Sequence, residues 1–285
     1  MSSRPSRDDA AGVAYLDLRQ LAHSTNRPTD ELLQLYALEG FLDRLAESRH
    51  RTDLILKGGV LLAAFGVRRP TRDIDFAATH PLADAELVGD VINEVLNVER
   101  PDGLEFDTSS TVTEPIRSND PYPSTRVRVS GRLASAKIRF HIDVNVGDPL
   151  SPKPGPTEVP RLLGGLPITV IGYSRELVLA EKIVTAIQRG TANTRWRDFV
   201  DIATLATQPV DDQVLQSSIA QVAAYRQAQL RPLAETLAGF AELAQVRWEA
   251  WRRKQRLDDA PQSFDEVLNR VIDFADPQIT AAQSL

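Results

Sequence analysis

Apolar residues recur every three or four positions over residues 30–49, which predicts a long amphipathic helix whose leucines face a core. Thr29 precedes this segment directly, where its hydroxyl would cap the helix N-terminus. An earlier helix is expected over about residues 11–22, and DAELVGDVINEVLNV, residues 84–98, predicts a later amphipathic helix. Helices are therefore expected on both sides of the segment between residues 50 and 84.

That intervening segment predicts two short strands joined by a turn. DLILKGG contains a buried strand at residues 54–56 that runs into a glycine turn, and RDIDFAA, residues 72–78, is expected to form the second strand. Between them GGVLLAAFG, residues 58–66, predicts a short apolar helix that ends at Gly66.

Alternation of apolar and polar residues replaces the helical period from about residue 104 to residue 146. Two strands are expected in the second half of this region, around a turn at Ser130 and Gly131. In the second strand the predicted core-facing residues are Ile138, Phe140, Ile142, Val144 and Val146. Those predicted on the opposite face are Arg139, His141, Asp143 and Asn145.

A proline-rich segment, DPLSPKPGPTEVPRLLGGLP, residues 148–167, is typical of a connector, and the chain beyond Tyr173 has mostly helical patterns. The order of elements predicts an α+β fold with two lobes. We expect residues 1–160 to form a lobe with a mixed sheet and flanking helices, and residues 161–285 to form a mostly helical lobe.

Composition narrows the class of protein. The chain has 285 residues and no cysteine, which excludes disulfides and thiolate zinc sites. Its start lacks a signal-peptide pattern and no apolar run approaches the ~20 residues of a membrane span, so a cytoplasmic protein is expected. The net charge is −6, yet basic residues cluster over residues 117–139 and 247–256. Such clusters fit either solvated faces or nucleic-acid contacts.

The motif RDIDF places two carboxylates on one face of a strand. Asp73 and Asp75 are two residues apart, and Asp143 lies on the polar face of another predicted strand. Three oxygen ligands from adjacent strands suit Mg²⁺ or Mn²⁺, as in phosphoryl-transfer sites. The alternative for an isolated Asp-x-Asp motif is a solvated strand edge.

The glycine pair upstream favours the metal hypothesis. Gly58 and Gly59 follow a strand and begin a helix, where exposed N–H groups bind anions and the absence of a Cβ lets a phosphate approach. One end of the segment can therefore hold a triphosphate, and the other its metal. The sequence lacks a P-loop, a dinucleotide-binding glycine motif, a nucleophile elbow and any metal-ligand spacing of its histidines.

Four segments, in this order, resemble AbiEii/AbiGii-type toxins, a branch of the polymerase-β-like nucleotidyltransferase superfamily. They are LEGFLDRLAES, LILKGGVLLAAFGVRRPTRDIDF, FHIDVNVGDP and RELVLAEKIVTAIQRGTANTRWRDFVDIATL, and they extend from about residue 30 to residue 205. Many relatives carry serine or threonine after the glycine pair, whereas this chain has Val60. A side-chain contact to the phosphates is therefore missing here.

The resemblance implies roles for further residues. Lys182 would neutralise phosphate charge, and Asp198, with Asp201 one turn later, corresponds to the acidic residue of the last motif. Without the resemblance these three residues would be ordinary charged positions on helices. Lys57 and Arg72 adjoin the motifs and are candidate phosphate contacts.

The resemblance also implies an activity and partners. It implies transfer of a nucleoside monophosphate from a nucleoside triphosphate to the 3′ end of tRNA, which blocks translation and arrests growth, and it implies a cognate antitoxin. Basic residues expected to contact the RNA backbone are Arg126, Arg128, Arg132, Lys137, Arg139, Arg252 and Arg253. Two alternatives stay open: transfer to a protein or small-molecule hydroxyl, and a non-catalytic nucleotide- or RNA-binding protein.

Overall fold

The computed structural model describes residues 5–79, 85–116, 124–258 and 260–285, which form two compact units. Unit 1 comprises residues 1–148 and 154–173, and unit 2 comprises residues 149–153 and 174–285. The predicted division after residue 160 falls inside unit 1, because a strand beyond it completes the sheet of that unit. A mixed α/β architecture, as predicted from the order of elements, is confirmed.

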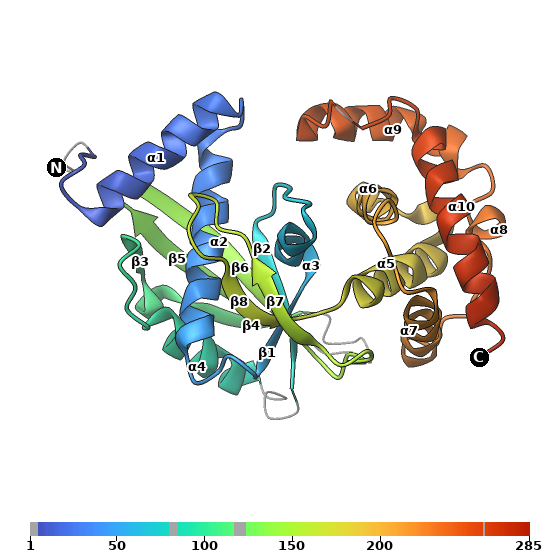
Figure 1. Cartoon of the computed structure of the whole chain (residues 1–285), viewed down its shortest axis with the longest axis horizontal. Coiled ribbons are helices and arrows are strands. Elements are labelled where there is room, and N and C mark those ends of the chain that lie inside the picture. Colours follow the sequence, from blue (N-terminus) through green and yellow to red (C-terminus); the bar gives the residue numbers. More distant parts are fainter. Residues whose placement is uncertain (1–4, 80–84, 117–123, 259) are drawn as a thin grey trace. The chain divides into compact units, whose positions relative to one another are not determined.

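Unit 1 is built on one mixed sheet (Figure 1). Its strands are β1 (Leu54–Lys57), β2 (Asp73–Ala78), β3 (Leu104–Phe106), β4 (Val112–Ile116), β5 (Ser124–Leu133), β6 (Ala136–Val146), β7 (Gly155–Val159) and β8 (Ile168–Gly172). The order is β3-β5-β6-β2-β1-β8-β7, and β4 also pairs with β5. Strands β2 and β6 are parallel, as are β1 and β8, whereas the other pairs are antiparallel.

Helices α1 (Ala10–Ser24), α2 (Thr29–Glu47) and α4 (Ala85–Leu96) pack on the apolar side of this sheet. Phe41 of α2 contacts Phe76 of β2 with ring centroids 6.0 Å apart, and both side chains are fully buried. Thr29, predicted as the N-cap of α2, is instead its first helical residue. The cap position belongs to Pro28, whose fixed φ suits the extended backbone there.

The turn between β5 and β6 differs from the prediction. Ala134 and Ser135 form it, and Ala134 adopts a φ of 49°. Gly131 lies inside β5. Glycine is needed at this position because a Cβ there would be 2.8 Å from both the carbonyl oxygen of Glu105 and the ring of Phe106. This glycine therefore marks the close approach of β3.

The proline-rich segment contains a strand that the sequence analysis did not predict. Strand β7 pairs with β8, and β8 adds to β1. Pro156 is tolerated in β7 because that strand ends the strand order, where one edge needs no ladder hydrogen bonds. Since β8 continues the sheet, the segment belongs to unit 1 rather than marking its end.

Unit 2 is helical, as predicted (Figure 1). Its helices are α5 (Arg175–Arg189), α6 (Trp196–Leu205), α7 (Asp212–Tyr225), α8 (Leu233–Thr236), α9 (Phe240–Gln255) and α10 (Phe264–Ala282). Its core holds an aromatic cluster of Trp196, Phe199, Phe240, Trp248 and Phe264, in which Trp196 and Phe240 stack at 5.8 Å. In the part of the chain that the structure describes, no helix combines the length and apolar character needed to cross a membrane.

Candidate active site

The three predicted carboxylates share one face of the unit 1 sheet. In the parallel pair of β2 and β6, Asp73 is the register partner of His141, and Asp75 is the partner of Asp143. Register partners on neighbouring strands point to the same face. This is the face opposite Phe76 and α2, so the predicted convergence of Asp73, Asp75 and Asp143 on one face is confirmed.

Asp75 and Asp143 form the centre of a charged row that crosses four strands. From β1 to β5 the row reads Lys57, Asp75, Asp143 and Arg126, each the register partner of the next. Adjacent strands lie about 4.8 Å apart, so the two carboxylates are direct neighbours. A cation therefore stands on each side of the acidic pair.

Arg126 binds Asp143 with both arms of its guanidinium. Its Nε donates to Oδ1 at 2.8 Å and its Nη2 donates to Oδ2 at 2.7 Å. The Asp143 side chain is only 12% exposed. The hydrogen bond to Asp143 raises the pKa of Arg126, and the charges of Asp73 and Glu114 raise it further. Arg126, predicted to contact RNA, is thus held by the third predicted metal ligand.

Lys57 is bound inside unit 1. Its ammonium forms a buried ion pair with Asp148 and lies 5.7 Å from the centroid of the Tyr173 ring. The Tyr173 hydroxyl donates to the same carboxylate at 3.5 Å. Sequence reasoning assigned Lys57 to phosphate and missed Asp148, which lies two residues after the end of β6 in the motif FHIDVNVGDP. The structure gives Lys57 a role in joining β1 to the end of β6.

The glycine turn is shaped by Asp75. Gly58 has a φ of +70°, and a Cβ on it would lie 1.9 Å from Oδ2 of Asp75. The carboxylate therefore rests against the bare backbone at the start of α3 (Gly58–Leu61). Helix α3 passes into a 3-10 turn, Leu62–Phe65, and Gly66 ends it with a φ of 76°, as predicted. With a single α-helical turn, α3 offers backbone N–H groups but only a small dipole.

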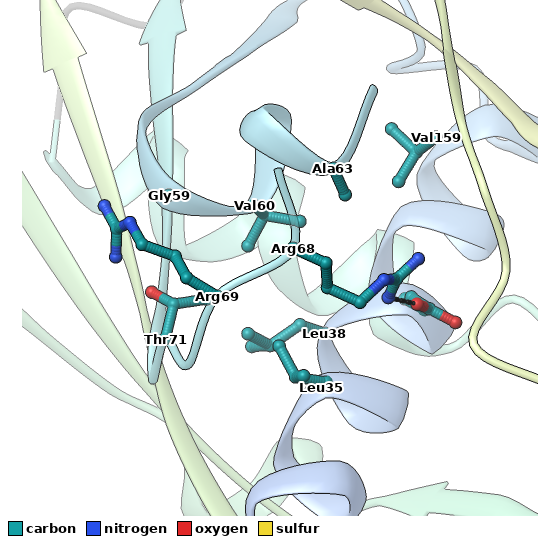
Figure 2. A pocket seen from close by; sticks show the side chains of 10 residues that line it. Leu35, Leu38, Gly59, Val60, Ala63, Arg68, Arg69, Thr71 and Val159 are labelled. Atoms are coloured by element: carbon teal, nitrogen blue, oxygen red, sulfur yellow. Dashed lines mark hydrogen bonds and ion pairs between the residues drawn. The ribbon is translucent and has the colours of Figure 1, made fainter. Parts of the chain in front are cut away.

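Arg69 and Thr71 lie beside Gly59 in a small pocket (Figure 2). The position of a Cβ on Gly59 would be 3.0 Å from Oγ1 of Thr71 and 3.2 Å from Nη1 of Arg69. The Thr71 hydroxyl donates to Oδ1 of Asp73 at 2.6 Å. Sequence reasoning chose the exposed Arg72 instead. Residues 69–72 precede β2, so strand alternation gave no signal for Arg69 or Thr71.

The other wall of this pocket is apolar, which suits Val60 at the position where many relatives carry serine or threonine. Figure 2 shows Val60 near Leu35 and Leu38 of α2. The Val60 side chain is buried, so a hydroxyl here would have to be satisfied inside an apolar wall. At the polar end of the wall Arg68 pairs with Glu39, and burial raises the pKa of Glu39 despite that ion pair. Position 60 therefore serves packing in this chain.

Lys182 is the centre of a buried ion cluster in unit 2. Its ammonium donates to Asp198 at 2.7 Å and to Asp201 at 2.8 Å, and Arg195 also pairs with Asp198. Burial acts to raise the pKa of Asp198, but Lys182 and Arg195 outweigh it, so the net pKa is lowered. The predicted placement of Asp198 and Asp201 on one face of α6 is confirmed. The preceding residue, Glu181, forms an ion pair with Arg226.

Besides Arg126, four predicted RNA contacts lie on the same face as the carboxylates. Arg128 is the register partner of His141, and Arg132 is the partner of Lys137. Arg139 has the same parity on β6, and all four basic side chains are exposed. Arg128 pairs with Glu114 and Arg132 with Glu105. The face is therefore acidic at Asp75 and Asp143 and basic towards the N-terminal end of β6.

The basic residues of α9 in unit 2 differ from one another. Arg252 donates to the carbonyl oxygens of Ala260 at 2.7 Å and Asp258 at 2.8 Å, so it closes the loop after α9. Arg253 is exposed. Of the two predicted RNA contacts here, only Arg253 presents its charge mainly to solvent.

The donor chemistry at Asp73 and Asp75 fits a hard cation such as Mg²⁺. At Asp143, however, each oxygen already accepts a hydrogen bond from Arg126, so a cation there would compete with a guanidinium. Consistently, among the residues that the structure describes, no group of three or more histidine or acidic side chains is arranged to hold a metal ion.

The sequence profile described as "Nucleotidyl transferase AbiEii toxin, Type IV TA system" matches residues 40–270. The chain belongs to the AbiEii family. AbiEii proteins are nucleotidyltransferase toxins of toxin–antitoxin systems, so membership implies a nucleotide substrate and a cognate antitoxin. The match includes both glycines, the acidic face of the sheet and the Lys182 cluster.

Solved structures support the AbiEii fold. MenT4, a nucleotidyltransferase toxin from Mycobacterium tuberculosis H37Rv, is similar with a TM-score of 0.60 and 20% identity, over 95% of this chain and 90% of that one. JHP933 from Helicobacter pylori is similar with a TM-score of 0.52 and 14% identity, over 89% of this chain and 94% of that one. The search of curated proteins found no match.

Replacing Gly58 by alanine tests the contact with Asp75. A positive φ costs alanine ~1–2 kcal/mol, and at Gly58 the new methyl group also collides with the Asp75 carboxylate. Gly66→Ala is the matched control, since Gly66 has a φ of +76° and nothing within 4 Å of the added Cβ. We expect Gly58→Ala to lower the free energy of unfolding more than Gly66→Ala in urea titrations. Equal losses would contradict the contact.

Asp198→Asn tests the ion cluster of unit 2 through pH. The variant should lower the free energy of unfolding by about 1.5–3 kcal/mol at neutral pH, since two cations lose a charged acceptor. Because the folded pKa of Asp198 is lowered, this difference is complete above the unfolded value of ~3.9 and fades as pH falls through the folded pKa. Urea titrations over a pH series measure it. The exposed Asp90→Asn should show no such trend.

Proposed function

We propose that this AbiEii toxin transfers a nucleoside monophosphate from a nucleoside triphosphate to the 3′ end of tRNA in the cytoplasm, which blocks translation and arrests growth. The observation that carries the proposal is the single sheet face on which Asp73, Asp75 and Asp143 lie beside the Gly58 turn and a basic stretch of β5 and β6. The carboxylates suit a metal ion, the exposed backbone of the turn suits the phosphates of a nucleotide, and the basic strands suit an RNA backbone.

The donor side of the reaction would lie at the glycine turn. Backbone N–H groups at Gly58 and Gly59 and the guanidinium of Arg69, which lies against Gly59, are suited to the triphosphate. A Mg²⁺ ion on Asp73 and Asp75 would supply positive charge to the phosphates when bound. Thr71 holds Asp73 in place through its hydroxyl. In unit 2, Lys182 is the residue that the family resemblance assigns to phosphate charge.

The acceptor side would follow the basic stretch. Lys137 lies six residues before Asp143 on β6, which corresponds to ~20 Å of strand. Arg128, Arg132 and Arg139 lie on the same face between these two positions. An RNA backbone bound along this stretch would place its terminal hydroxyl near Asp143. A cationic drug as acceptor is disfavoured by the same charges.

The chemical step exchanges the phosphoanhydride bond between the α- and β-phosphates for a phosphodiester bond to the acceptor. The acceptor oxygen bonds to the α-phosphorus, the bond from that phosphorus to the bridging oxygen breaks, and pyrophosphate leaves with the electron pair. Asp143 is the carboxylate on the acceptor side, so we assign to it the orientation of the hydroxyl and acceptance of its proton.

Incubation with total RNA, Mg²⁺ and each α-labelled nucleotide tests the activity. We expect label in RNA of tRNA size, and its loss by at least ~100-fold in Asp73→Ala and Asp75→Ala, because each removes charge that faces the phosphates. Asp90→Ala changes an exposed carboxylate of α4 and should keep the activity. Label in the protein or in a small molecule would indicate another acceptor. RNA binding without any transfer would indicate a non-catalytic binding protein.

Salt dependence tests the basic stretch. If Arg128, Arg132, Lys137 and Arg139 contact phosphates, the logarithm of RNA affinity should fall with the logarithm of salt at a slope of about −3, or ~0.7 per contact. Lys137→Gln and Arg139→Gln should each make the slope shallower by ~0.7. Arg270→Gln on α10 removes an exposed arginine with its own partner, Glu266, and should leave the slope unchanged. Filter binding across a salt series measures it, and identical slopes in all variants would contradict the assignment.

A further inference from the structure

We propose that Arg126 is a built-in counter-ion that occupies Asp143 in place of a divalent cation, and that a cation binds Asp143 only when Arg126 withdraws. The proposal rests on the proposed function, in which a divalent ion is held on the sheet face at Asp73 and Asp75, and it extends cation binding to their neighbour Asp143. It adds a competitor for that site from the chain itself and assigns a role to a residue outside the quoted motifs.

The first observation is that Arg126 donates a hydrogen bond to each oxygen of the Asp143 carboxylate. Both oxygens of Asp143 accept from one guanidinium, at 2.8 Å and 2.7 Å. A divalent ion would need at least one of the same oxygens. An ion and a guanidinium on one carboxylate would also repel each other in a site where Asp143 is mostly shielded from water.

The second observation is that the arginine stands where positive charge is required. Asp75 and Asp143 are register partners, so two negative groups are neighbours on adjacent strands. Arg126 is in turn the register partner of Asp143, and the backbone ladder of β5 and β6 holds the pair in alignment. Arg126 therefore offsets part of the negative charge of the acidic face.

The third observation is that a second carboxylate, Glu114, lies beside Arg126 on the neighbouring strand. Glu114 on β4 is its register partner on the side away from Asp143. The Glu114 side chain is 33% exposed and now accepts from Arg128 at 2.6 Å. The Arg126 side chain is itself 31% exposed, so a change of rotamer needs no opening of the core. Arg126 could thus exchange one carboxylate for another within its own row.

Titration of the full-length protein with Mn²⁺ alone, followed by electron paramagnetic resonance and calorimetry, tests the competition. We expect Arg126→Gln to bind Mn²⁺ at least 10-fold more tightly than the wild type, because the competing charge is gone. Arg126→Lys should lie between them, since lysine keeps the charge but loses the two-armed contact. Arg128→Gln removes the same charge two residues along the same face and should stay within about threefold of the wild type.

A double variant locates the ion. In Arg126→Gln with Asp143→Asn, the gain in Mn²⁺ affinity should disappear. Unchanged or weaker binding in both Arg126 variants would overturn the proposal, as would a gain that survives Asp143→Asn or is matched by Arg128→Gln. Circular dichroism spectra and thermal melts confirm that each variant is folded, and Arg126→Lys keeps the test open if Arg126→Gln does not fold. Nucleotide transfer by the wild type tests the proposed function separately, so the two can fail independently.

Discussion

Two carboxylates placed directly across neighbouring strands are the constraint on which the rest of the sheet face depends. Asp75 and Asp143 are register partners in a parallel pair, and their repulsion must be offset by positive charge on the same face. The sheet places that charge in the same row, with Lys57 on one flank and Arg126 on the other. Arg126 binds Asp143 directly, whereas Lys57 turns to Asp148 at the end of β6. The row is thus arranged around its acidic centre.

The glycine turn and the acidic face depend on each other, because the side chain of Asp75 packs directly against the turn. Because Asp75 rests against the backbone of Gly58, the turn needs a residue without a Cβ for two separate reasons, the positive φ and the space for the carboxylate. Gly59 in turn leaves room for Thr71 and Arg69, and Thr71 holds Asp73. The short segment between the glycines and the aspartates therefore folds back so that its two ends contact each other.

Sequence patterns predicted directions well and partners poorly. Alternation alone placed Asp143 on the polar face of β6, and the parity of Asp73 and Asp75 was equally secure, because side-chain direction in a strand is a local property. The pairing of Arg126 with Asp143 depends on the register of β5 against β6, and a predicted turn at Ser130 and Gly131 would have changed that register. Strand β7 was missed for a related reason. Its proline is acceptable only at an edge, and edge position is known only once the strand order is known.

The overall charge of −6 conceals an uneven distribution that the register makes visible. Within the described residues, Arg128 and Arg132 each pair with a carboxylate from an edge strand, so part of the basic charge on this face is already compensated. Lys137 and Arg139 are exposed at the N-terminal end of β6 and form no ion pair with another described residue. A polyanion approaching the sheet would therefore be attracted more strongly at that end than at Asp75 and Asp143. If the acceptor is RNA, as proposed, such a gradient would orient the strand along β6 with its uncharged terminal hydroxyl towards the carboxylates.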